Sequence, residues 1–100
     1  MGPLDSVPIH IYTRQNAIDD GVLIHVGDVV GKEPISVCFT AHLLDAYHNP
    51  HSRQRLVREG LRLLSRQEED DGYRRLRVVE ERVWVIWDAE GITFMRPEDY

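Results

Sequence analysis

The residues of this sequence best suited to a binding chemistry are its arginines. Many of them are concentrated in one short segment. Residues 53–66 contain five arginines and one acidic residue, Glu59, although the chain of 100 residues carries a formal net charge of -5. A local positive field of this kind attracts phosphate groups, and further arginines at residues 74–77 extend it along the chain. The pattern predicts a macromolecule-binding surface that consists of Arg53, Arg55, Arg58, Arg62, Arg66, Arg75 and Arg77.

The same arginines also have an interpretation as a solvated helix face that nearby carboxylates neutralise. Acidic residues follow at 68–71 and again at Glu80 and Glu81, so charge compensation within the chain is available. Domains that bind nucleic acid are usually basic, whereas this chain is acidic, and Tyr73 is the only aromatic residue between residues 53 and 77. We therefore favour the compensated surface and keep nucleic-acid binding through the helix at 53–66 as the alternative.

Three histidines, His42, His48 and His51, lie close together in the sequence with Asp45 between them. A zinc site needs three or four ligands that converge tetrahedrally. His42 and His48 are six residues apart, whereas a spacing of four would place two ligands on one face of a helix. We interpret these residues as surface histidines near a turn between helices, and we expect neither a metal nor another cofactor.

Cys38, His42 and Asp45 have the residue types of a nucleophile, a base and an orienting carboxylate. The sequence around them contains no glycine-rich elbow, and Cys38 falls within an alternating strand pattern. A free cysteine commonly behaves as a small hydrophobic core residue. We interpret Cys38 as a buried structural thiol and predict no catalytic residues, so the sequence favours a protein that is not an enzyme.

The elements that must position these residues are organised around the stretch from Tyr73 to Arg96. This stretch predicts three strands joined by tight reversals at Glu80–Arg82 and at Asp88–Gly91, and it holds both tryptophans. The middle strand is apolar on both faces, which suits an interior position in a sheet. Such a meander needs a cover for its apolar face, and helices upstream can supply it.

Upstream of the meander the sequence predicts alternating strands and helices. Their expected bounds are a short strand at residues 9–12, a helix over Arg14–Asp20 capped by Thr13, a strand over Val22–Val26, a helical turn at Val29–Val30, a strand over Ile35–Phe39, a helix over Ala41–His48 capped by Thr40, and a helix from the Asn49–Pro50 cap to about Arg66.

These elements predict an α+β domain. We expect an antiparallel sheet of four or five strands, which includes the C-terminal three-stranded meander, with two or three helices on one face. Residues 1–8 are expected to form a flexible leader, residues 9–100 a single domain, and residues 96–100 a polar tail.

Composition narrows the class of protein further. A chain of 100 residues with 42% hydrophobic residues can bury one core but is only marginally stable alone, so a homodimer that buries more apolar surface is compatible with it. The single cysteine excludes an internal disulfide and fits a reducing compartment. Because the sequence has no apolar run long enough for a bilayer and no signal-peptide pattern, we expect a cytoplasmic protein without membrane contact.

Two blocks of the sequence resemble a small uncharacterised bacterial family. Residues 12–23, YTRQNAIDDGVL, with Pro34–Val37, resemble the opening of that family, and residues 92–99, ITFMRPED, resemble its closing block. The family is a domain of unknown function found on plasmids, phages and other mobile elements, and the arginine-rich middle of this chain departs from its pattern. The resemblance implies an α+β fold and an accessory role in bacterial or viral gene traffic, and it transfers no catalytic residue.

These observations favour a non-enzymatic interaction protein that binds another macromolecule, with an unknown protein as its partner. Nucleic-acid binding through the arginine-rich helix is the alternative. A third interpretation is mimicry of a phosphate run by acidic residues in the first half of the chain. Only six carboxylates occur in residues 1–52, which is few for a mimic: Asp5, Asp19, Asp20, Asp28, Glu33 and Asp45.

Overall fold

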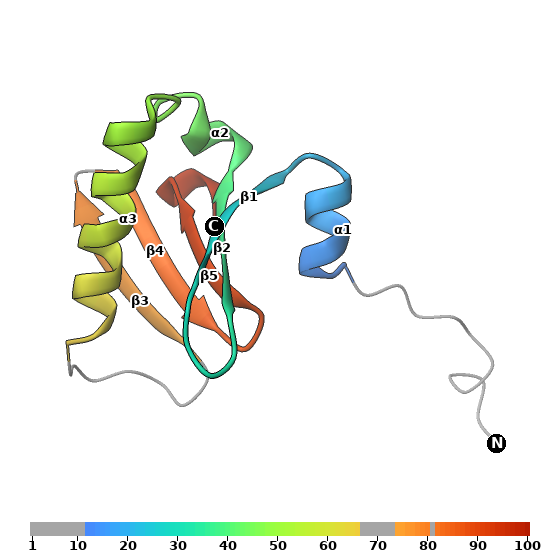
Figure 1. The fold of residues 1–100 in the computed structure, drawn as a ribbon. Helices are drawn as coiled ribbons and strands as arrows, with labels where there is room; N and C mark the ends of the chain where they lie inside the picture. Colours follow the sequence, from blue (N-terminus) through green and yellow to red (C-terminus); the bar gives the residue numbers. More distant parts are fainter. Residues whose placement is uncertain (1–11, 67–73, 81) are drawn as a thin grey trace, which may run out of the picture.

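The structure is a computed structural model that describes residues 12–66, 74–80 and 82–100 (Figure 1). The elements follow in the order α1 (Arg14–Asp19), β1 (Leu23–Val29), β2 (Ile35–Thr40), α2 (Ala41–Leu44), α3 (Pro50–Leu64), β3 (Arg75–Glu80), β4 (Val83–Asp88), β5 (Gly91–Met95) and the 3-10 turn η2 (Pro97–Asp99). The predicted α+β class and the C-terminal meander of β3, β4 and β5 are confirmed. The leader predicted at residues 1–8 and most of the strand predicted at 9–12 lie outside the described residues.

The five strands form one sheet in the order β1-β2-β5-β4-β3. Three neighbouring pairs are antiparallel, whereas β2 and β5 run parallel, with Val37 opposite Ile92 and Phe39 opposite Phe94. The sheet is therefore mostly antiparallel, with one parallel pair that the sequence analysis did not anticipate. Parallel neighbours need a long crossover connection, and the segment from α2 to β4 supplies it.

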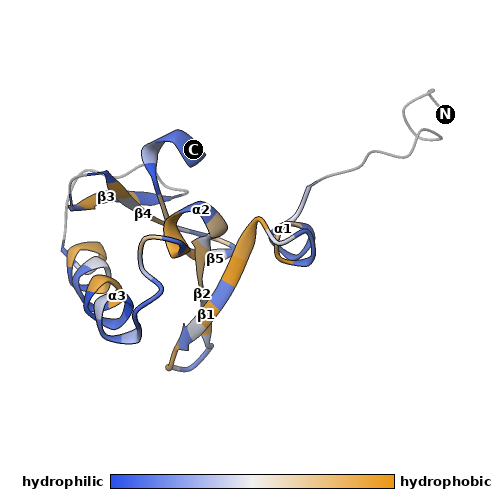
Figure 2. Cartoon of the chain, turned by 90° about the horizontal axis from the view of Figure 1, so that it is seen from above, coloured by the Kyte–Doolittle hydropathy of each residue, from blue (hydrophilic) through white to orange (hydrophobic). Residues whose placement is uncertain are grey.

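One face of this sheet and helix α3 enclose the hydrophobic core. Side chains alternate between the two faces of a strand, and the buried residues of the core are Val37, Phe39, Leu43, Leu56, Leu64, Val83, Val85, Ile92 and Phe94. The rings of Phe39 and Phe94 lie 5.2 Å apart between centroids. Helix α3 packs mainly over β3 and β4, so it leaves the β1 side of this face less covered (Figure 2).

Side-chain caps begin the helices where the sequence pattern predicts them. The Thr13 hydroxyl accepts a hydrogen bond from the Asn16 N–H, and the Asn16 side chain accepts one from the Thr13 N–H. The Thr40 hydroxyl caps α2, and the Asn49 side chain caps α3, with Pro50 at the first helical position. These local signals explain why the helix starts are the best-predicted boundaries of the fold.

Strand β1 is longer than the sequence predicts. The pattern ends the strand at Val26 and assigns a helical turn to Val29–Val30, but the strand continues to Val29. A β-bulge between His25 and Gly27 shifts the register against β2, and pairing resumes at Gly27, opposite Val37. The predicted helical turn was therefore wrong.

Helix α2 is shorter than the sequence predicts. It ends at Leu44 instead of His48. The backbone N–H groups of Ala46 and Tyr47 donate to carbonyls three residues earlier, a 3-10 pattern that tightens the last turn. The chain then leaves the helix and reaches the Asn49 cap of α3.

Helix α1 packs on the side of the sheet opposite α3, and Arg14 fastens it there (Figure 2). The Arg14 guanidinium donates to Thr93 Oγ1 at 2.6 Å, to the Ile92 carbonyl at 2.7 Å and to the Ser36 carbonyl at 3.2 Å. These acceptors belong to β2 and β5, so one side chain bridges the parallel pair. The fold thus has a helix on each side of the sheet.

In the described part of the chain, every helix is too short or too polar to cross a membrane.

Candidate functional site

Four of the predicted arginines share the exposed side of α3 and its C-terminal end. Arg55, Arg58, Arg62 and Arg66 recur at spacings of three and four residues, which lines side chains up along one side of a helix, and all four are exposed. We call these four residues the arginine face. Within the described chain, Arg62 is the one member with an ion pair, to Glu59 at 2.6 Å. This hydrogen bond lowers the pKa of Glu59 and raises that of Arg62.

Arg75 and Arg77 reach from β3 to the C-terminus of α3. Arg75 donates to the Leu64 carbonyl at 2.9 Å, and Arg77 donates to the carbonyls of Leu63 at 3.2 Å and Arg66 at 3.1 Å. The last carbonyls of a helix lack partners within it and carry a partial negative charge. Arg77 is only 6% exposed. The structure therefore engages these two predicted site residues in holding α3 on the sheet.

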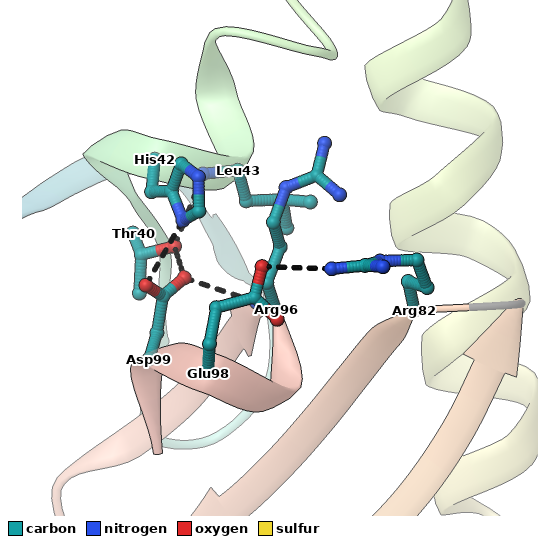
Figure 3. Close-up of polar contacts among 7 residues, drawn as sticks. All are labelled: Thr40, His42, Leu43, Arg82, Arg96, Glu98 and Asp99. Atoms are coloured by element: carbon teal, nitrogen blue, oxygen red, sulfur yellow. Dashed lines mark hydrogen bonds and ion pairs between the residues drawn. The ribbon is translucent and has the colours of Figure 1, made fainter.

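A polar cluster lies where the parallel strands β2 and β5 both end (Figure 3). The Asp99 carboxylate accepts hydrogen bonds from the Thr40 hydroxyl at 2.9 Å and the Arg96 N–H at 3.1 Å, and it lies 3.1 Å from His42 Nδ1. Partial burial raises the pKa of Asp99, but these contacts lower it by more, so it lies below its usual value. We call this cluster the polar end; it consists of Thr40, His42, Tyr47, Glu80, Arg82, Arg96, Glu98 and Asp99.

The remaining contacts of the polar end come from β3, from the turn between β3 and β4, and from the segment after α2. Arg82 pairs with Glu98 at 3.1 Å and has a φ of 69°, a left-handed conformation uncommon in residues other than glycine. The Tyr47 hydroxyl donates to Glu80 at 2.8 Å. Arg96 contrasts with these pairs, because its Nε is buried and has no hydrogen-bond partner in the described chain.

The groups considered as metal ligands or as a catalytic set have other partners. His42 contacts Asp99, at the far end of the sequence, and His48 contacts the backbone carbonyl of Asp45. Cys38 is free and fully buried. Over residues 12–66, 74–80 and 82–100, no group of three or more potential ligands is arranged to hold a metal ion.

An apolar groove runs between α3 and β1, where α3 covers the sheet least. Its volume is about 330 Å³, and its lining consists of Val26, Gly27, Asp28, Val29, Val30, Val37, Val57 and Leu61. A neighbouring hollow of about 370 Å³ shares Val26 and Val57 and is also lined by Arg53. We call the two together the valine groove. Arg53 therefore belongs to this groove, on a different side of α3 from the arginine face.

Comparisons of this chain with protein-family models, with curated proteins and with solved structures find no match in any of the three. The resemblance to the mobile-element family therefore stays a prediction. The fold and its surfaces define the class of protein, a small α+β domain with an arginine face, a polar end and a valine groove. Its function has to be inferred from these surfaces.

The site residues predicted from the sequence do not include the C-terminal members of the polar end, which are Arg96, Glu98 and Asp99. The sequence pattern assigns residues 96–100 to a polar tail, but Pro97–Asp99 form the turn η2 and return Asp99 to Thr40. A local signal for this turn exists, because proline and acidic residues are favoured at the first positions of a helix. The contacts that the turn makes have no such signal, since they join residues 59 positions apart.

Proposed function

We propose that this protein is a non-enzymatic interaction protein that binds an extended segment of a partner protein in the valine groove. The observation that carries the proposal is that the groove lies beside β1, an end strand of the sheet. In the described chain β1 pairs only with β2. The unpaired backbone groups of an end strand are a template for an added strand.

The lining of the groove defines the chemistry of the segment. Successive side chains of a strand point to opposite faces, so every second side chain of an added strand would enter the groove. Apart from Gly27 and Asp28, the larger hollow between α3 and β1 is lined by valine and leucine side chains, which favours apolar residues at those positions. Arg53 has no ion pair in the described chain and provides donors for a carboxylate. The segment therefore alternates apolar residues and carries one carboxylate.

Selection from a displayed library of random peptides tests this proposal. We expect the selected peptides to alternate apolar residues and to contain an acidic residue or a C-terminal carboxylate near Arg53. A labelled selected peptide, followed by fluorescence anisotropy, should bind a Val57→Glu variant at least about tenfold more weakly, because a charge then occupies the apolar groove. The matched control is Arg58→Gln, which alters the arginine face on the same helix.

Two results would contradict the proposal. One is a selection that yields no binding peptide, and the other is a peptide that binds Val57→Glu as tightly as the unchanged protein. A homodimer could use the same outer edge of β1. Sedimentation velocity over a range of protein concentrations would reveal it as a mass that rises with concentration and falls in the Val57→Glu variant.

A second candidate function is nucleic-acid binding through the arginine face. It is favoured by one specific observation, that Arg55, Arg58 and Arg66 have no ion pair in the described chain. The test is anisotropy of labelled duplex DNA, single-stranded DNA and RNA. Affinity should fall steeply between low and physiological salt, and Arg58→Glu with Arg62→Glu should abolish it while Val57→Glu leaves it unchanged. Absence of binding at low salt would exclude this candidate.

The proposed setting is the reducing cytoplasm of a bacterium, including one infected by phage. Cys38 supports a reducing compartment, because it is a free thiol within the core. The resemblance of the opening and closing blocks to a mobile-element family supports the bacterial or phage origin of the partner.

A further inference from the structure

Two consecutive carboxylates at the polar end each contact a different element of the fold. Glu98 pairs with Arg82, in the turn between β3 and β4, at 3.1 Å. Asp99 accepts a hydrogen bond from the Thr40 hydroxyl at 2.9 Å and lies 3.1 Å from Nδ1 of His42, in α2 (Figure 3). Both carboxylates are thus recognised by side chains that are distant from them in the sequence.

Tyr100 continues the same pattern at the next position. Its ring packs against that of Trp84 in β4, with 5.8 Å between the centroids and an angle of 65° between the planes. The guanidinium of Arg74 lies over the Tyr100 ring, 5.1 Å from its centroid, and donates to the Tyr100 hydroxyl. We call residues 98–100 the acidic segment. Its receiving surface consists of Thr40, His42, Arg82 and Trp84.

The backbone of the acidic segment makes its hydrogen bonds within its own turn. In the described chain, the Asp99 N–H donates to the Arg96 carbonyl at 2.9 Å, and the Tyr100 N–H donates to the Pro97 carbonyl at 3.2 Å. The residues of η2 are not buried, and Tyr100 is exposed. Exposed ion pairs stabilise a fold only weakly. The segment can therefore leave its receiving surface by local opening while the sheet stays intact.

The receiving surface is accessible and carries donors for carboxylates. The side chains of Arg82 and His42 are 63% and 54% exposed although both contact the acidic segment. Arg82 has a φ of 69°, at which glycine would be less strained, so a guanidinium is present there despite a cost in backbone energy. A carboxylate from another chain would meet the same donors as Glu98 and Asp99 do.

We propose that the receiving surface is a binding site for an acidic segment of a partner protein, and that residues 98–100 occupy it as an internal competitor. The partner's first carboxylate pairs with Arg82, and its second accepts from Thr40 and His42. An aromatic ring at the next position packs against Trp84. The site shares no residue with the valine groove or the arginine face, so it does not depend on either function proposed above.

Fluorescence anisotropy of a labelled peptide that copies residues 96–100, Arg-Pro-Glu-Asp-Tyr with an amidated C-terminus, tests the proposal. The peptide is titrated with the unchanged protein and with an opened variant, Glu98→Ala combined with Asp99→Ala. We expect the opened variant to bind at least about tenfold more tightly, because the apparent affinity scales with the fraction of molecules whose site is vacant. A peptide with glutamine and asparagine in place of its two acidic residues should not bind.

Further variants separate a built site from the general charge of the molecule. In the opened background, Arg82→Gln and His42→Gln should each weaken binding of the peptide by about fivefold or more. Arg58→Gln, which removes a positive charge from the arginine face, should bind within about twofold of the opened variant. Glu33→Gln combined with Glu90→Gln raises the net charge as much as opening does and should bind no more tightly than the unchanged protein.

A measurement on the unchanged protein keeps the test valid if the opened variant does not fold, which circular dichroism would reveal. Excess unlabelled peptide should displace the acidic segment and shift the NMR resonances of the Trp84 indole N–H and the Tyr100 amide. The proposal is overturned if these resonances do not move, if the neutral peptide binds as tightly as the acidic one, or if the folded opened variant binds no more tightly than the unchanged protein. Equal weakening by Arg58→Gln and Arg82→Gln would also overturn it.

Discussion

Gly60 lies where α3 meets the ring of Phe94. A Cβ atom at residue 60 would overlap Cε2 and Cζ of that ring, which is fully buried and cannot turn away into solvent. The glycine is therefore present for space, since its backbone is helical and needs no unusual φ. A helix interior otherwise favours alanine over glycine by about 1 kcal/mol.

Gly60→Ala is expected to destabilise the protein despite this helix propensity. Overpacking of a core costs about 1–3 kcal/mol, which exceeds the gain from alanine. Urea unfolding would show a lower midpoint, and Phe94→Leu in the same chain should reduce the loss because the smaller side chain leaves room. Gln54→Ala, at an exposed position of α3, is the control. A Gly60→Ala protein of equal or higher stability would show that the helix can shift away from the ring.

Asp99 gives the polar end a dependence on pH. Its pKa in the folded protein lies below the usual value because the contacts from Thr40, Arg96 and His42 outweigh the effect of burial. A lowered pKa in the folded state adds stability above the pKa of the unfolded chain, which is about 4 for aspartate. That stability is lost as the pH falls through the lower folded value.

We therefore expect the free energy of unfolding to fall more steeply in the unchanged protein than in Asp99→Asn between about pH 5 and pH 2.5. Denaturant unfolding at a series of pH values measures both slopes. Asp88→Asn is the control, since Asp88 is an exposed carboxylate of the turn between β4 and β5. Parallel curves for the unchanged protein and Asp99→Asn would show that Asp99 does not couple folding to protonation.

At the scale of elements, different interactions stabilise the two ends of helix α3. Its first turn has a local cap from Asn49, whereas its last turn depends on Arg75 and Arg77 from β3. The guanidinium of Arg75 also lies over the Trp87 ring of β4, 5.5 Å from the centroid. The last turn of α3 therefore takes side-chain donors from the meander, whereas the first turn has a cap next to it in the sequence.

Arg77→Met is expected to loosen the last turn of α3 selectively. Methionine keeps the length of the buried stem but leaves the Leu63 and Arg66 carbonyls without these donors, at a cost of about 1–3 kcal/mol. Amide hydrogen exchange should rise in the last turn of α3 and remain unchanged in its first turn. Arg58→Met is the control on the same helix. A uniform rise along α3 would mean that Arg77 stabilises the whole fold instead of this helix end.

At the scale of the whole molecule, Arg14 joins the start of the described chain to its last strand. The hydrogen bond from Arg14 to Thr93 joins residues 79 positions apart. The hydrogen bond from Arg14 to the Ser36 carbonyl reaches β2, the other strand of the parallel pair. Gly91 keeps this junction open, because a Cβ atom at residue 91 would lie 2.6 Å from the Ser36 carbonyl oxygen and 3.2 Å from the Arg14 guanidinium. Helix α1 thus depends on a polar contact between strands for its position.

Arg14→Met is expected to release α1 from the sheet and to make the buried thiol of Cys38 more accessible. Cys38 contacts Ser36 at 3.7 Å, and Ser36 in turn contacts the Arg14 guanidinium. Reaction of Cys38 with a thiol reagent in native buffer should accelerate at least about tenfold, because local opening exposes the thiol. Gln15→Met, an exposed position on the same helix, should react at the original rate. Unchanged reactivity in Arg14→Met would show that α1 does not protect the thiol.

The features of the fold that depend on neighbouring residues were predictable, because their signals lie close together in the sequence. The caps at Thr13, Thr40 and Asn49 precede their helices directly, and Gly91 has a φ of 137° at the predicted second reversal. The candidate site was predictable only in part. Arg55, Arg58, Arg62 and Arg66 share one side of α3 because helical spacing places them there, whereas the predicted surface also included Arg53, which the same spacing places on a different side of the helix.

The sequence by itself determined the α+β class, the starts of the helices, the meander and the arginine face, since each follows from residues within a few positions of one another. The tertiary structure alone decided the parallel pairing of β2 with β5, the capping of α3 by Arg75 and Arg77, and the assembly of the polar end. Those features join residues from distant parts of the chain. A local periodicity in the sequence does not predict such contacts, because they depend on which strands become neighbours when the core forms.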